Sequence, residues 1–268
     1  MSERLGHHYQ RHHQTDSIRT PRMTCLGKIL PSTMSDKTVL DFATEVDSYA
    51  EPHLLPNAQD LKDTLDTSNS HAIPQIAVSP AQGKFLSLLT RLSGTRNVLE
   101  IGTLGGYSTI CFAKALRQRG QGGKVTSIEI LKDRQELAVQ NLRNAGISVP
   151  DEAEVLLGSA LDVLPQLEAE IEQGQRPRFD FVLIDADWEN HWPYFDYGVR
   201  LSNGAGSVVY VDNAVGAMRR FGIVGPGTDK KEVVSLVDKV GADSRVDAAL
   251  MQTVGAKGHD GFLMAMVL

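Results

Sequence analysis

Cysteine, aromatic residues and long hydrophobic runs are all scarce in this chain. Only two of its 268 residues are cysteine, Cys25 and Cys111, and aromatic residues make up 6%. Two cysteines cannot build a disulfide framework, so we expect free thiols in a reducing compartment, with Cys111 in the core. No apolar stretch approaches the ~18 residues that span a bilayer, and no secretory signal is recognisable. The sequence therefore predicts a cytoplasmic protein without a membrane partner.

Basic residues are also in short supply. The chain carries 27 Lys and Arg against 33 Asp and Glu, a formal net charge of −6. A nucleic-acid partner needs a basic face to meet the phosphates, so we expect none. Hydrophobic residues make up 41% and charged residues 22%, which is the composition of a globular chain with a sizeable core.

The first thirty residues are poor in acidic residues and lack apolar periodicity. They hold five basic residues, two acidic ones and four histidines, His7, His8, His12 and His13. We predict a flexible N-terminal extension over residues 1–37 and one domain over 38–268. Metal binding by the histidines and a mitochondrial presequence are the two alternatives for this segment.

The remainder of the chain alternates between strand and helix patterns. From 39 to 72 the pattern is helical and polar, interrupted by Pro52 and Pro56, and a helix begins at Ser79 and Pro80 with an apolar face over 85–92. Five short apolar runs follow at 97–101, 124–130, 153–157, 179–185 and 207–211, and helical segments lie at 108–118, 132–145, 160–173, 190–200 and 229–240. Two further strands, 248–254 and 261–267, have no helix between them. This order predicts a Rossmann-like α/β fold. We expect seven strands, mostly parallel, with a C-terminal antiparallel hairpin and helices on both faces.

A glycine-rich turn follows the first apolar run. Gly102, Gly105 and Gly106 stand between this strand and the next helix, a place where backbone approaches a ligand closely. Their spacing is not that of a dinucleotide site. Glu100 is an acid in an otherwise apolar strand and needs a donor if buried, and Glu129 ends the second strand, where a carboxylate accepts hydrogen bonds from ribose. The pattern favours an adenosine ligand with an amino-acid tail.

Acidic side chains follow two later strands. Asp185 and Asp187 come after the fourth apolar run, and Asp212 and Asn213 come after the fifth. The carboxyl ends of parallel strands meet at one edge of a sheet, so these groups face the same crevice as the glycine turn. Carboxylate and amide oxygens suit Mg²⁺, whereas the alternative is that the aspartates only cap helices.

Six segments in this order resemble the class I methyltransferases that use S-adenosylmethionine (SAM), and more narrowly the cation-dependent O-methyltransferases of the catechol and caffeoyl-CoA type. The segments are 82–86, 98–109, 128–129, 158–160, 185–187 and 212–213. The resemblance implies a homodimer and a divalent cation such as Mg²⁺ held by Asp185, Asp212 and Asn213. It implies that SAM is bound by Glu100, Gly102, Ser108, Glu129, Ala160, Asp187 and Tyr194.

The sequence departs from this family at one position. A lysine that the family commonly uses as the base is replaced by Trp188, which has no proton acceptor. As catalytic residues we assign Asp185, which orients the cation, and His191 as the replacement base; the alternative for His191 is a surface position on its helix. Trp188 and Trp192 are alternatively an aromatic wall for a flat substrate.

The predicted activity is methyl transfer from SAM to one hydroxyl of a small aromatic vicinal diol. A carboxylic-acid methyltransferase is the first alternative, since it needs no strong base and Arg219 and Arg220 could meet a carboxylate. A SAM-binding protein without catalysis is the second. The glycines in 214–227 predict a mobile loop over the crevice.

Overall fold

The structure is a computed structural model that describes residues 38–56, 58–120, 122–225 and 234–268. The predicted flexible extension over 1–37, its four histidines and the mitochondrial alternative lie outside the described residues. Within the described ranges, no helix combines the length and the apolar character that crossing a bilayer requires.

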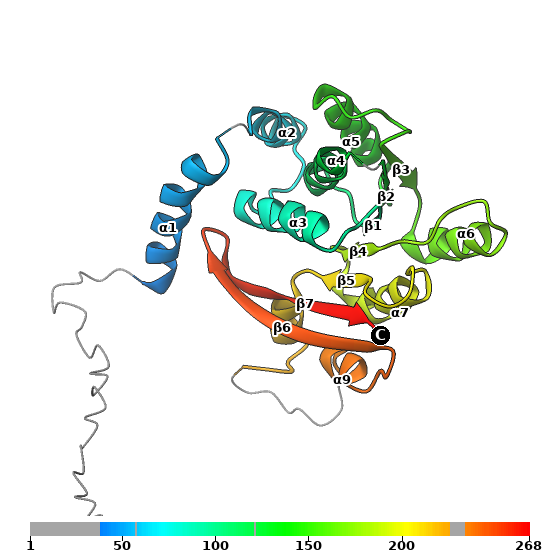
Figure 1. Ribbon diagram of the computed structural model, residues 1–268. Coiled ribbons are helices and arrows are strands. Elements are labelled where there is room, and N and C mark those ends of the chain that lie inside the picture. Colours follow the sequence, from blue (N-terminus) through cyan, green and yellow to red (C-terminus); the bar gives the residue numbers. More distant parts are fainter. Residues whose placement is uncertain (1–37, 57, 121, 226–233) are drawn as a thin grey trace, which may run out of the picture. The chain divides into compact units, whose positions relative to one another are not determined.

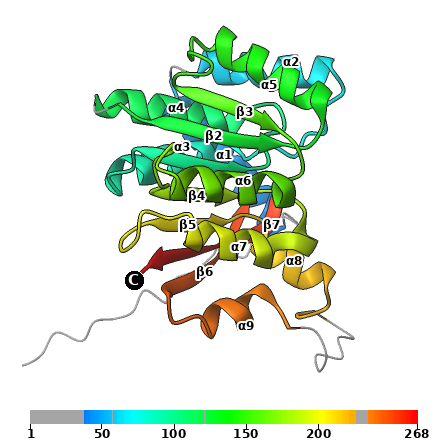
Figure 2. The same ribbon diagram turned by 90° about the vertical axis from the view of Figure 1, so that its right-hand side faces the viewer.

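A seven-stranded sheet forms the centre of the domain (Figures 1 and 2). Its order is β3-β2-β1-β4-β5-β7-β6, with β1 to β5 parallel and β7 antiparallel to both neighbours. The predicted Rossmann-like sheet with a terminal hairpin is confirmed. The strands are β1 (Asn97–Ile101), β2 (Lys124–Glu129), β3 (Ala153–Leu157), β4 (Phe181–Ile184), β5 (Val208–Val211), β6 (Val246–Gly255) and β7 (Gly258–Val267).

The strand order reverses beside β1, and this reversal positions the ligand crevice. β1 pairs with β2 on one side and with β4 on the other. The connections after β1 and β4 therefore leave the sheet in opposite directions and open a crevice at the carboxyl ends of the strands.

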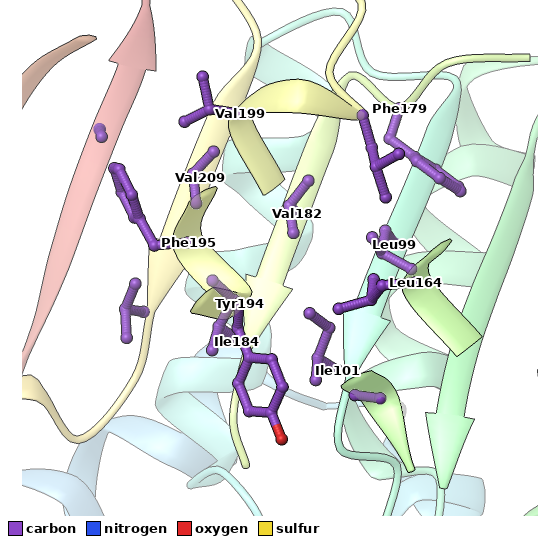
Figure 3. Packing of buried hydrophobic residues seen from close by; sticks show 14 of the residues in the cluster. Leu99, Ile101, Leu164, Phe179, Val182, Ile184, Tyr194, Phe195, Val199 and Val209 are labelled. Carbon is purple, nitrogen blue, oxygen red and sulfur yellow. The ribbon is translucent and has the colours of Figure 1, made fainter. Parts of the chain in front are cut away.

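Helices cover both faces of the sheet because alternate strand residues are apolar on both sides. Val98 and Leu183 pack among the residues of α3, α4 and α5, while Leu99 and Ile184 pack beneath α6 and α7 (Figure 3). The helices are α1 (Val39–Leu54), α2 (Gln59–Ser70), α3 (Pro80–Leu92), α4 (Tyr107–Arg119), α5 (Lys132–Asn144), α6 (Ala160–Glu172), α7 (His191–Arg200), α8 (Ala214–Arg220) and α9 (Leu236–Gly241), with a 3₁₀ turn, η1 (Trp188–Asn190), before α7.

The C-terminal hairpin is longer than predicted and reaches the ligand edge of the sheet. β6 and β7 stay paired as far as Gly255 and Gly258, which leaves a turn of two residues, Ala256 and Lys257. Because β6 runs in the same direction as β1 to β5, this turn lies at their carboxyl ends. The Ala256 N–H donates to the Asp47 carboxylate of α1 at 2.8 Å, which fixes the turn.

Two predicted boundaries in the helical segments are wrong, and the start of a third predicted helix lies outside the described residues. Pro52 lies inside the last turns of α1 and does not break it. The predicted loop over 214–227 begins with α8, whose first turn is held because Gly216 N–H donates to Asp260 at 2.8 Å. For the helix expected over 229–240, residues 229–233 lie outside the described residues, and the described helix α9 begins at the Ser235–Asp238 capping box.

The apolar face predicted for α3 is largely exposed. Leu86 is buried, as are Gly83 and Thr90, whereas Phe85 and Leu92 are exposed. The helix therefore buries Gly83, Leu86 and Thr90, while Phe85 and Leu92 face outward, which helical spacing alone does not predict.

Leu164 gives a direct test of the packing between α6 and the sheet. Its side chain is fully buried near Leu99, so Leu164→Ala should lower the free energy of unfolding by about 2–5 kcal/mol. Leu161→Ala, at an exposed position of the same helix, is the matched control and should change it by less than about 1 kcal/mol. Chemical denaturation measures both, and equal losses would contradict the assigned orientation of α6.

Candidate active site

A cavity of about 660 Å³ opens at the carboxyl ends of the strands. Its walls come from the connections that follow β1, β2, β3, β4 and β5. The predicted residues that line it are Gly102, Ser108, Glu129, Ala160, Asp185, Asp187, Tyr194 and Asn213. The structure thus brings together most of the residues that the sequence indicated, in a volume typical of a small-molecule site.

The backbone of these residues is fixed by the parallel ladder. Beyond the strand ends, Gly102 N–H donates to Ile128 O at 3.1 Å, and Asp185 N–H donates to Ile101 O at 2.9 Å. In the same way Asp212 N–H donates to a β4 carbonyl, that of Ile184, at 2.9 Å. Each of these three residues therefore makes the last backbone hydrogen bond beyond its strand, and the packed sheet fixes its position.

Gly102 is the position where a glycine is required. Its φ of +96° lies in the left-handed region, and a Cβ atom there would collide with the carbonyl oxygen of Asp185. The connections after β1 and β4 can approach this closely only because residue 102 has no side chain.

Glu129 is held at the end of β2 by two backbone donors. The N–H of Leu104 reaches its Oε2 at 2.9 Å, and the N–H of Leu131 reaches Oε1 at 3.0 Å. The carboxylate therefore joins the glycine turn to the start of α5 and keeps free lone pairs toward the cavity that it lines.

Glu100 lies behind the cavity wall. Its side chain has no exposed surface, and its Oε2 accepts hydrogen bonds from Thr109 and, at 2.5 Å, from Ser127. Burial raises the pKa of this carboxyl group, and the neighbouring hydroxyl groups act in the opposite direction. Its Oε1 has no hydrogen-bond partner. The hydrogen-bond donors that a buried carboxylate requires are thus present. Glu100 does not line the cavity, because it lies under the glycine turn.

Asp187 and Tyr194 form a hydrogen-bonded unit on the cavity wall. The Tyr194 hydroxyl donates to Asp187 Oδ1 at 2.6 Å, and the Asn190 amide donates to Oδ2 at 2.5 Å. Figure 3 shows the Tyr194 ring below Ile184, with its hydroxyl pointing away from the other labelled core residues. Burial and the nearby carboxylate raise the pKa of Tyr194, so it remains a donor that orients Asp187.

Asp185 and Asp212 bring two carboxyl groups close together. Burial is the main cause that raises the pKa of each, and the charge of Asp212 raises that of Asp185 further. The described residues contain no group of three or more His, Cys, Asp or Glu side chains that could hold a metal. The donor set at this edge is therefore two carboxylates and the Asn213 amide. Such hard oxygen donors, too few to enclose an ion, fit a divalent cation that keeps other oxygen ligands.

Two residues of the hairpin complete this edge, and the sequence analysis missed both. The Asn213 Nδ2 donates to Asp260 Oδ2 at 3.4 Å, an orientation that leaves the amide oxygen available. Lys257 donates to the carbonyl of Ala77, a cavity residue, and its charge favours the ionised forms of Asp185 and Asp212. The signal that could have found them is topological, because the hairpin turn must lie at the carboxyl ends of the strands.

His191 lies outside this cavity. It is 3% exposed, which contradicts the surface alternative, and it lines a second cavity of about 290 Å³ together with Trp192. Burial lowers the pKa of His191 to about 4, against the opposing charges of Asp187, Glu189 and Asp260. Trp188, in place of the lysine, lines both cavities.

Comparisons with known proteins identify the family of this chain. Residues 51–265 match the profile of the O-methyltransferase family. The O-methyltransferase imqG of Aspergillus flavus is 39% identical over 222 residues, covering 82% of this chain and 87% of that protein. The catechol O-methyltransferase of Mycobacterium tuberculosis is 40% identical over 225 residues, covering 83% and 95%.

A solved structure agrees in the same way. The O-methyltransferase from Bacillus cereus, in complex with SAH, superposes with a TM-score of 0.74 at 37% identity, covering 85% of this chain and 100% of that one. The chain belongs to the O-methyltransferase family. The predicted membership in the catechol and caffeoyl-CoA type is confirmed, and with it the prediction of an enzyme.

The pKa of His191 predicts how stability depends on pH. The unfolded chain takes up a proton near the ordinary value of 6.5, whereas folded His191 does so only near 4. Between these values the unfolded state binds more protons, so stability falls as the pH falls. Between pH 7 and pH 5 the wild type should lose about 2 kcal/mol more than His191→Phe. Urea unfolding of both proteins at the two pH values measures this, and equal losses would show that His191 titrates normally.

Proposed function

We propose that this enzyme transfers a methyl group from SAM to one hydroxyl of a small aromatic vicinal diol with the help of a divalent cation. The observation that carries the proposal is the single cavity edge where Gly102 and Glu129 stand beside Asp185 and Asn213. A solved relative that holds SAH and a relative named catechol O-methyltransferase support it.

Different residues of the cavity would bind the adenine, the ribose and the methionine part of SAM. Glu129 would accept hydrogen bonds from the ribose, and Ala160, after β3, would lie beside the adenine. Asp187, oriented by Tyr194, would bind the ammonium group of the methionine part, near Gly102 and Ser108. Glu100 would act from behind the wall by fixing the start of α4 through Thr109.

Asp185, Asp212 and Asn213 would hold the cation. When bound, a divalent cation supplies a Lewis acid that lowers the pKa of a hydroxyl group and fixes both oxygens of a diol. Asp185 is common to both functions, because its carbonyl meets Gly102 and its carboxyl faces Asp212. Asp260 would keep the Asn213 oxygen turned toward the ion, and Lys257 favours the ionised carboxylates.

Neither Trp188 nor His191 supplies a base at the diol. Trp188 has no acceptor, and His191 lies in the second cavity with a pKa of about 4. We assign the acidity of the diol to the cation and the removal of its proton to water. This assignment replaces the predicted role of His191 as a base.

The two alternatives gain no support from the geometry. Arg219 and Arg220 are exposed and line neither cavity, and the Arg220 guanidinium lies 3.7 Å from Glu189. The reason to favour a carboxylic acid is thereby removed. Against a SAM-binding protein without catalysis stands the complete set of Asp185, Asp212 and Asn213.

A homodimer also remains a proposal. Large apolar side chains are exposed on α1, including Phe42 and Tyr49, and on the edge strand β6, including Met251 and Val254. Exposed apolar residues grouped in this way are typical of a protein interface. The N-terminal helical region, expected to be polar, thus has an apolar side.

Removal of the cation tests the proposed reaction. Methylation of catechol should be lost in EDTA and return with Mg²⁺, and Asp212→Asn should reduce the Mg²⁺-supported rate at least about 100-fold while binding of SAH persists. The exposed Asp162→Asn is the control and should respond like the wild type. Full activity in EDTA would refute the cation's role. Methylation of a monophenol or a benzoate in preference to catechol would refute the diol, and SAH binding without any methylation would favour the non-catalytic alternative.

Substitution of Glu129 tests the ribose assignment. Glu129→Gln keeps an acceptor for a backbone donor but removes the charge, so the affinity for SAH should fall about 3- to 10-fold by calorimetry. Glu136→Gln, exposed on α5, is the matched control and should leave the affinity unchanged. An unchanged affinity for SAH in Glu129→Gln would refute the assignment of Glu129 as the group that binds the ribose.

A further inference from the structure

The second cavity, of about 290 Å³, is built mainly from aromatic and apolar side chains. It lies between the start of α7, helix α8 and the start of α9. Trp188, Trp192, Met218, Phe221 and Leu236 contribute its apolar walls. An apolar hollow of this kind favours an apolar or aromatic group over a charged one.

One buried polar atom beside this cavity lacks a partner. His191 lines the cavity and is 3% exposed, and its Nε2 has no hydrogen bond. A buried polar atom without a partner is destabilising, so a ligand atom that pairs with it gains affinity. Because the ring is neutral near pH 7, it takes an uncharged partner, and a hydroxyl group can pair with either tautomer.

Trp188 borders both this cavity and the proposed SAM cavity. The Trp188 side chain lines both, three residues after the candidate cation ligand Asp185. A ligand whose diol lies at Asp185 can therefore extend along the Trp188 indole into the second cavity. The charged side chains nearby already have partners, since the Lys239 ammonium lies 5.2 Å from the centre of the Trp192 ring and Glu189 pairs with Arg220.

We propose that the second cavity is an acceptor subsite, and that the natural substrate is an aromatic diol with a second ring that bears a hydroxyl group. The diol ring lies at Asp185, the second ring packs between Trp188 and Met218, and its hydroxyl pairs with His191 Nε2. This inference rests on the proposed diol methylation and adds the substrate class. It also gives Trp188 a binding role in the place of the lysine.

Three diols test the subsite. The probes are catechol, 3,4-dihydroxybiphenyl and 3,4,4′-trihydroxybiphenyl, and the quantity measured is kcat/KM for each relative to catechol. In the wild type we expect the trihydroxy compound to be favoured over catechol by at least about tenfold, with the dihydroxy compound between them. Met218→Trp fills the cavity and should abolish the preference for both biphenyls. Met266→Trp, exposed on β7 far along the strand from the turn, is the matched control and should keep it.

His191→Phe separates the two parts of the subsite. It keeps an aromatic ring of similar size, so it should remove the advantage of the trihydroxy over the dihydroxy compound, about 3- to 10-fold, and keep the preference for biphenyl over catechol. Equal ratios in the wild type and Met218→Trp would overturn the subsite. An advantage of the 4′-hydroxyl that survives in His191→Phe would overturn the pairing.

A binding measurement distinguishes failure of the subsite from failure of the proposed reaction. Calorimetry of 3,4,4′-trihydroxybiphenyl in the presence of SAH should show weaker binding to Met218→Trp than to Met266→Trp. If this holds while no diol is methylated, the proposed reaction fails and the subsite stands. If the diols are methylated and the two variants bind alike, the subsite fails and the reaction stands.

Discussion

The close approach of Gly102 to the carbonyl oxygen of Asp185 is the constraint on which the site depends. It joins the turn after β1 to the turn after β4 across the point where the strand order reverses. The ladder bond from Asp185 N–H to Ile101 O, at 2.9 Å, holds the same two turns together. The proposed SAM turn and the proposed cation ligand therefore move as one unit, which a reaction between two bound groups requires.

The same geometry concentrates negative charge, and the fold provides the means to tolerate it. Asp185 and Asp212 approach each other in a region of low solvent access, where burial raises the pKa of both and the charge of Asp212 raises that of Asp185 further. The C-terminal hairpin supplies a compensating positive charge, because its turn places Lys257 near both carboxyl groups. The terminal hairpin thus closes the sheet and completes the electrostatics of the site.

The parts of the molecule that follow from local pattern could be predicted, and those that follow from packing could not. The mostly parallel sheet and the acids at strand ends follow from the alternation of apolar runs and helices, so Asp185, Asp212 and Glu129 were placed correctly at the sheet edge. The exposed face of α3 could not be predicted, because a helix that buries Gly83 and Leu86 looks apolar on its opposite side. His191 and Lys257 depend on contacts with distant segments, which no local spacing records.

Trp188 shows that the residues that position the reacting groups differ from those proposed to select the substrate. The ladder fixes Asp185 from its backbone, so the reacting end of the site does not need the side chain at position 188 for its position. A tryptophan there forms a wall common to two cavities, and a substrate that fits both is held at two points. Two-point binding fixes which of two adjacent hydroxyl groups faces the methyl donor, whereas a single ring can turn over. In the proposed reaction, the absence of a base at this position would be accompanied by a gain in orientation, with the acidity of the diol left to the cation.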